Sequence, residues 1–120
     1  MVMEYKDLDV WKKARILAKE AIIIARSLPS NENYSLAFQL SKSAISIPSN
    51  IAEGCGRNTS KDTLQFLFIS RGSLFELETQ VFLCFDFGYI NEIQLNVTID
   101  SITECKKLLN GFINYYKGKL

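Results

Sequence analysis

The chain has 120 residues, of which 48% are hydrophobic and 22% charged, so it can form one domain with a buried core. Fourteen basic and thirteen acidic residues leave a formal net charge of +1, which argues neither for nor against a nucleic-acid partner. The absence of histidine excludes Ser-His and Cys-His catalytic pairs and histidine-based metal sites. No glycine-rich phosphate-binding motif occurs, and we expect a protein with no catalytic activity and no cofactor.

The cysteines, the N-terminal residues and the apolar runs indicate in which cellular compartment the protein is expected. Cys55, Cys84 and Cys105 are widely spaced and no C-x-x-C occurs, so we expect buried reduced thiols, with neither disulfides nor a zinc site. The N-terminal residues are too charged for a secretory signal, and no apolar run approaches the roughly 18 residues of a membrane span. These features predict a soluble, cytoplasmic protein with no membrane partner.

The first predicted helix covers residues 7–28. Asp7 is a candidate N-cap, and Pro29 ends the helix because the residue before a proline disfavours helical geometry. Apolar residues recur along it at the spacing of one helical face: Val10, Ala14, Leu17, Ala21, Ile24 and Leu28.

The second predicted helix covers residues 33–57 and contains Pro48. An interior proline costs roughly 3 kcal/mol and leaves the carbonyl of Ala44 without its donor. One stripe nevertheless keeps its phase across the proline: Leu36, Leu40, Ala44, Ile47, Ile51 and Cys55. We therefore expect a single helix that is kinked at Pro48, with Gly54 and Gly56 favouring its end.

The third and fourth predicted helices cover residues 60–87 and 92–117. Thr59 or Ser60 can cap the third helix, and Gly88 can end it. Asn91 precedes the fourth helix, with Gln94 at the capping-box position. The β-branched stretch 96–100 could form a strand, but the longer helical period outweighs it.

Four helices with short connections predict an all-α fold, a single domain over residues 1–120. We expect an antiparallel up-down-up-down four-helix bundle. The third helix carries apolar residues on several sides, including Phe68, Phe75 and Phe82. Large exposed apolar patches usually mark interfaces, so this helix predicts a homo-oligomer.

A polar row runs along the second helix at steps of four, three and four residues: Ser46, Asn50, Glu53 and Arg57. The third helix carries Arg71, Ser73 and Glu76 between its apolar lines. We interpret these seven residues as a structural polar network, in which Arg71 approaches Glu53 or Asn50, because buried charges must pair. A solvated surface is the alternative, and catalysis is a weaker one.

A basic row lies on the first helix. Its members are three, four and seven residues apart and share one face: Lys12, Arg15, Lys19 and Arg26. Such a stripe is what phosphate binding requires, and these residues are our candidates for contact with nucleic acid. An ordinary solvated helix face is the alternative, since Asp7, Asp9 and Glu20 lie nearby.

Four stretches resemble the 23S rRNA intervening-sequence protein family of four-helix-bundle proteins: YKDLDVW, LAFQLSKSAISIPSNIAEGCGR, ISRGSLFELETQ and LNGFINYY. The family is in turn similar to the accessory variability determinant of diversity-generating retroelements. The resemblance implies a ring-shaped homo-oligomer, typically a pentamer, with a proposed role in binding structured RNA or DNA. It also implies a largely structural role at ten positions: Ser46, Pro48, Asn50, Glu53, Gly54, Arg57, Arg71, Ser73, Glu76 and Glu78.

Two functional hypotheses follow. The first is a non-catalytic oligomeric protein that binds structured RNA or DNA. The second is a structural or protein-interaction module, whose partner is another protein and which binds no nucleic acid. A helical ribonuclease or a di-metal carboxylate bundle is disfavoured, because both depend on histidine.

Overall fold

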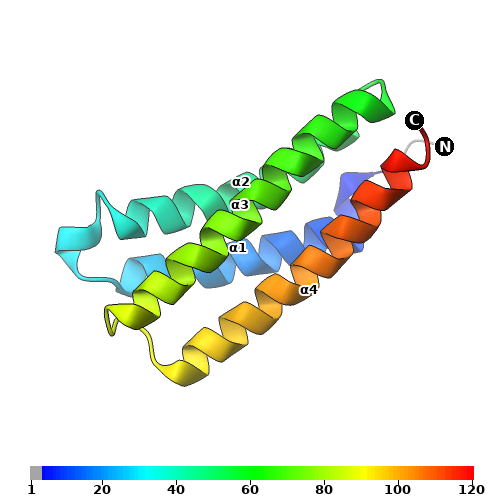
Figure 1. The fold of residues 1–120 in the computed structure, drawn as a ribbon. Helices are drawn as coiled ribbons and strands as arrows, with labels where there is room; N and C mark the ends of the chain where they lie inside the picture. The colour runs from blue at the N-terminus through cyan, green and yellow to red at the C-terminus, as the bar shows by residue number, and fades with distance from the viewer. Residues whose placement is uncertain (1–3) are drawn as a thin grey trace.

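The computed structural model describes residues 4–120 and contains four long helices (Figure 1). They are α1 (Asp9–Ser27), α2 (Leu36–Cys55), α3 (Ser60–Asp86) and α4 (Glu92–Lys117). Two 3-10 helices, η1 (Tyr5–Asp7) and η2 (Ser30–Glu32), precede α1 and α2. Residues 4–120 contain no β-strand, which confirms the predicted all-α class and excludes a strand at residues 96–100.

The beginnings of the helices agree with the sequence in part. Thr59 caps α3 by accepting a hydrogen bond from the amide of Asp62, and Asn91 forms the expected capping box with Gln94. Asp7 does not cap α1, because it ends η1 and Leu8 takes the cap position. We expected the second helix to begin at residue 33, but α2 begins at Leu36, after the separate 3-10 helix η2 at residues 30–32.

Gly88 ends α3 as expected. Its φ of 76° lies in the left-handed region, which favours glycine. The amide of Tyr89 donates to the carbonyl of Cys84 (2.8 Å), and that of Gly88 donates to Phe85 (2.9 Å). These two bonds form a Schellman motif, which satisfies carbonyls at the helix end and turns the chain towards α4.

α2 continues without interruption through Pro48, as the unbroken apolar stripe predicted. The helix ends at Cys55 with Gly56 in the C-cap position, near the end that the two glycines predicted, whereas Gly54 lies inside the helix, one residue before its end, and is buried. The bend at Pro48 stays a prediction.

The helices pack side by side, α1 with α2, α2 with α3, α3 with α4 and α4 with α1 (Figure 1). α2 and α3 run in opposite directions. Thr63 of α3 bonds to Gly54 of α2, whereas Ser70, seven residues further on, bonds to Ile47, seven residues earlier. The up-down-up-down order around all four helices stays a prediction.

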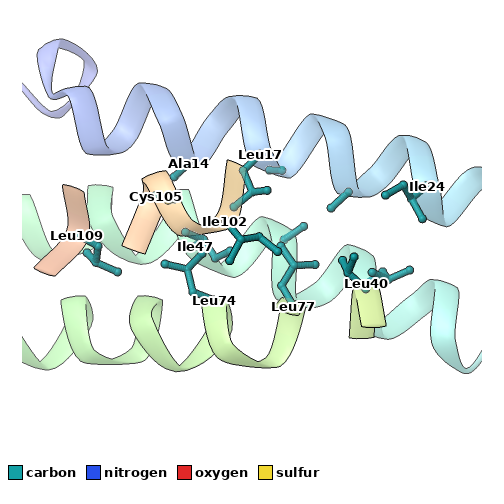
Figure 2. Packing of buried hydrophobic residues seen from close by; sticks show 14 of the residues in the cluster. Ala14, Leu17, Ile24, Leu40, Ile47, Leu74, Leu77, Ile102, Cys105 and Leu109 are labelled. Carbon is teal, nitrogen blue, oxygen red and sulfur yellow. The ribbon is translucent and has the colours of Figure 1, made fainter. Parts of the chain in front are cut away.

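All four helices contribute to one hydrophobic core (Figure 2). Fully buried side chains from each of them include Leu17, Ile47, Leu74, Leu77, Ile102 and Leu109. Burying one such side chain stabilises the fold by about 2 kcal/mol. No helix within residues 4–120 is long and apolar enough to cross a lipid bilayer.

The three cysteines are free thiols. Cys84 and Cys105 are buried as expected, whereas Cys55 is only half-buried. Burial raises the pKa of Cys84 to about 11 and that of Cys105 to about 12, so both remain protonated at neutral pH.

Candidate functional site

Part of the polar row packs between α2 and α3. Asn50 Nδ2 donates to the carbonyl oxygen of Ser46 (2.8 Å) and to its Oγ (2.9 Å). Ser73 Oγ on α3 donates to the same Ser46 Oγ (2.7 Å). The structure therefore brings three of the seven network residues together, and their polar atoms bond to one another.

Two further hydroxyls of α3 bond to the backbone of α2. Ser70 Oγ donates to the carbonyl of Ile47 (2.9 Å), and Thr63 Oγ1 donates to that of Gly54 (2.8 Å). Both hydroxyl groups belong to buried residues. The predicted polar network included neither Ser70 nor Thr63, although the two residues lie seven apart, on one face of α3. Together with Ser46, Asn50 and Ser73, these residues form what we name the polar seam.

Gly54 allows the helices to approach closely beside this seam. A Cβ atom at this position would lie 3.1 Å from the carbonyl oxygen of Thr63 and 3.2 Å from Cβ of Phe66. Neither atom belongs to the flexible end of a side chain. Gly54 therefore has a packing role, and a side chain there would push α3 away from α2.

The other members of the expected network lie outside the seam. Glu53 and Arg57 form an exposed ion pair one helical turn apart, and the guanidinium of Arg57 lies 4.4 Å from the ring centroid of Phe66. Exposed pairs of this kind contribute little to stability. Glu76 is exposed on α3.

Arg71 contacts α4, so the expectation that it approaches Glu53 or Asn50 is wrong. Its Nη1 donates to Oδ1 of Asn110 (3.4 Å), and its guanidinium lies 5.1 Å from the ring centroid of Phe68. Because α3 packs between α2 and α4, a residue of α3 can face either helix, and spacing within α3 alone cannot decide which.

A pair that the sequence did not suggest connects α3 with α4. Lys106 Nζ lies 2.7 Å from both carboxylate oxygens of Glu78, and both side chains are about three-quarters buried. Glu78 was expected to be structural, but its partner lies 28 residues away in the chain.

Three members of the basic row surround one surface hollow. All four row members are exposed. Lys12, Arg15 and Lys19 line a hollow of about 510 Å³ together with Lys6, Trp11 and Ile16, and we name this the basic hollow. Arg26 lies two turns further along α1 and lines a different hollow, beside Phe38 and Ile45. The structure therefore separates Arg26 from the other three.

Aromatic rings lie among these cations. The guanidinium of Arg15 lies 5.5 Å from the ring centroid of Trp11, and the rings of Tyr5 and Trp11 meet edge to face at 5.2 Å. Lys6 Nζ lies 6.0 Å from the Tyr5 ring. Sequence reasoning missed Lys6 and Trp11, although both occur in the YKDLDVW stretch. The spacing of four residues between Trp11 and Arg15 was a signal for Trp11, whereas Lys6 reaches the hollow through the packing of η1 against α1.

The cations of the basic hollow are available to a ligand. Among residues 4–120, no carboxylate lies within ion-pair distance of Lys6, Lys12, Arg15 or Lys19. The neighbouring Lys13 faces α4 instead, where it pairs with Glu104 at 2.8 Å. The hollow therefore presents positive charge that no residue of the described chain neutralises.

The outer face of α3 carries several large apolar side chains. It exposes four to five tenths of each of five large side chains: Phe68, Ile69, Phe75, Phe82 and Leu83. We name this the α3 apolar face. Lys106 and Lys117 lie over the rings of Phe75 and Phe68, at 5.1 and 5.8 Å. Residues 4–120 bring together no group of three Cys, Asp or Glu side chains that could hold a metal ion.

These observations define a small all-α protein with four packed helices, a basic hollow on α1 and an apolar face on α3. The family model for the 23S rRNA-intervening sequence protein matches residues 6–111. The chain belongs to this family, as its sequence motifs predicted.

A solved structure agrees with this assignment. It is a Bacteroides thetaiotaomicron protein of unknown function from the S23 ribosomal protein family. It is 25% identical and superposes with a TM-score of 0.81 over 87% of this chain and 97% of its own. No curated protein matches the chain.

Proposed function

We propose that this protein is a non-catalytic, homo-oligomeric module that binds structured RNA or DNA through the basic hollow of α1. The observation that carries the proposal is the group of four cations, Lys6, Lys12, Arg15 and Lys19, around one hollow without a carboxylate partner. Cationic side chains bind nucleic-acid backbones because each phosphate that they neutralise releases condensed counterions into solution.

Assembly would strengthen this binding. A net charge of +1 gives one subunit little overall attraction for phosphate. A closed ring repeats the basic hollow once per subunit. Several hollows that bind one nucleic acid together raise the overall avidity, although each hollow binds no more tightly than before. We propose a pentamer, in keeping with the resemblance described above.

The α3 apolar face is the surface that we propose for assembly. Monomeric proteins rarely expose large contiguous apolar patches, and Phe75 lies at the middle of this one, between Phe68 and Phe82. Sedimentation equilibrium at micromolar concentration should report an oligomer. Phe75→Glu should shift it towards monomer, whereas Asn96→Glu, which adds the same charge to an exposed position on α4, should not. A purely monomeric parent protein would overturn this part of the proposal.

Fluorescence anisotropy with labelled structured RNA and duplex DNA tests the nucleic-acid part. Measured at about 50 and about 200 mM salt, affinity should fall steeply, with a slope near −0.9 per phosphate neutralised on a duplex. Replacing Arg15 and Lys19 together by Glu should abolish binding and leave the sedimentation profile unchanged. Binding that survives this charge reversal would place the site elsewhere on the molecule.

A protein-interaction module is the second candidate, and the α3 apolar face favours it. The same surface that can join copies of this chain can bind a different protein. Absence of binding to RNA and DNA at the lower salt concentration would make this second candidate the better explanation.

A further inference from the structure

We propose that the basic hollow binds unpaired nucleic acid, RNA or DNA, and that at least one base stacks beside Trp11. This inference rests on the proposed function and specifies its ligand. Trp11, Arg15 and Lys19 are among the residues that line the hollow, so an aromatic ring and cations border the same space.

The arrangement of Trp11 and Arg15 suits a base. The indole ring is half-buried against the core, which holds it in place. The guanidinium of Arg15 lies over this ring at 5.5 Å, while Arg15 itself is exposed. The guanidinium of Arg15 is therefore close to the indole and accessible to a ligand. Planar arginine groups and aromatic rings are the surfaces on which unpaired bases stack.

The position of α1 disfavours a duplex as the ligand. A helix that reads duplex DNA enters the major groove, which is about 12 Å wide. α1 packs against both α2 and α4, so a ligand meets it only at its exposed face, as part of the surface of the bundle. In a duplex the bases are also stacked inside and cannot reach Trp11. A single strand can place phosphates on Lys12 and Lys19, about 10 Å apart along the helix axis, and turn a base towards the ring.

The site is bounded at the end of the bundle near η1. Tyr5 lines a second hollow, of about 460 Å³, together with Glu53 and Arg57. There the carboxylate of Glu53 already pairs with Arg57 and would repel a phosphate. We therefore assign the strand to the basic hollow alone.

The tryptophan count makes a direct test possible, because Trp11 is the only tryptophan in the chain. Intrinsic fluorescence of the full chain is titrated with oligouridylate and oligothymidylate of about 12 nucleotides, within the site sizes of single-strand binders. A duplex of the same length serves as the comparison. Both single strands should quench the emission, and the duplex should bind at least about tenfold more weakly, because its bases are not free to stack.

Two substitutions separate stacking from charge, each measured by anisotropy of the labelled single strands. Trp11→Leu should weaken binding about tenfold, whereas Trp11→Phe, which keeps a ring, should retain most of the affinity. Arg15→Lys preserves the charge but removes the planar group, and it should weaken binding several-fold. Arg15 is exposed, so this variant tests stacking even where Trp11→Leu perturbs folding. Arg26→Lys, the same charge-preserving change on the same helix but beside another hollow, is the matched control and should leave the affinity unchanged.

The outcomes distinguish this inference from the proposed function. Duplex binding as tight as single-strand binding would overturn the inference and leave the proposed function intact. Binding without quenching, or unchanged affinity in Arg15→Lys, would do the same. Failure of the parent protein to bind any of these nucleic acids would instead overturn the proposed function itself. A difference in affinity between oligouridylate and oligothymidylate would show whether the site prefers RNA or DNA.

Discussion

The polar seam between α2 and α3 and the basic row of α1 share one sequence pattern, polar side chains three and four residues apart. Their environments differ. Ser70 and Thr63 are buried and donate to carbonyls of the opposite helix. Arg15 and Lys19 are exposed, and no carboxylate of the described chain pairs with them. Polar groups that bond within the fold stabilise it, whereas polar groups without internal partners are the ones available to a ligand.

The largest expected effect comes from a side chain placed beside the polar seam. Gly54→Val should lower the free energy of unfolding by about 3 kcal/mol, because overfilling a packed interface forces the backbone to move. Gly72→Val is the control, since no atom lies within 4 Å of a Cβ built at Gly72. Urea unfolding measures both. Equal stability of the two variants would show that close approach at Gly54 is not required.

The buried hydroxyls should come next in effect. Ser70→Ala removes the hydrogen bond to Ile47 and should cost about 1 kcal/mol of unfolding free energy. Thr79→Ala on the same helix removes only an exposed bond to the carbonyl of Phe75 and should cost much less. Thermal unfolding of the two proteins distinguishes them. A smaller loss in Ser70→Ala than in Thr79→Ala would contradict the role of the seam.

Acid should weaken contacts at the end of the bundle that lies away from the termini (Figure 1). Hydrogen bonds from Ser35 and Tyr89 hold the pKa of Glu32 below its ordinary value. A lowered folded-state pKa stabilises the fold fully above the ordinary carboxyl pKa of roughly 4.3, and this contribution is lost as the pH falls through the folded value. Stability measured between pH 6 and pH 3, a range of roughly three units around these values, should therefore fall less steeply in Glu32→Gln. An unchanged slope would argue against this contact.

The smallest effect on stability should come from the basic hollow. Arg15 and Lys19 changed together to Glu should alter the free energy of unfolding by no more than about 0.5 kcal/mol, because both side chains are exposed and neither has a carboxylate partner among residues 4–120. The same protein should lose nucleic-acid binding. A large loss of stability in urea would show that Arg15 and Lys19 stabilise the fold. The basic hollow would then not differ from the polar seam in this respect.

Much of the fold could be predicted because it depends on local rules. The periodic stripe from Leu36 to Cys55 predicted one helix through Pro48, and the structure confirms it. Capping at Asn91 and the end of the third helix at Gly88 were predicted for the same reason, since each depends on residues within one helical turn. The motifs along the chain also identified its family.

The partners that polar side chains find on other helices were decided only by the tertiary structure. Helical spacing gives the face on which a residue lies, but the rotation of each helix within the bundle determines which neighbour that face meets. Arg71 therefore contacts Asn110 instead of α2, and Gly54 serves close packing instead of helix termination. Trp11 lies four residues before Arg15 on the same helix, so helical spacing already places it beside the basic row, whereas Lys6 lines the basic hollow only because η1 packs against α1.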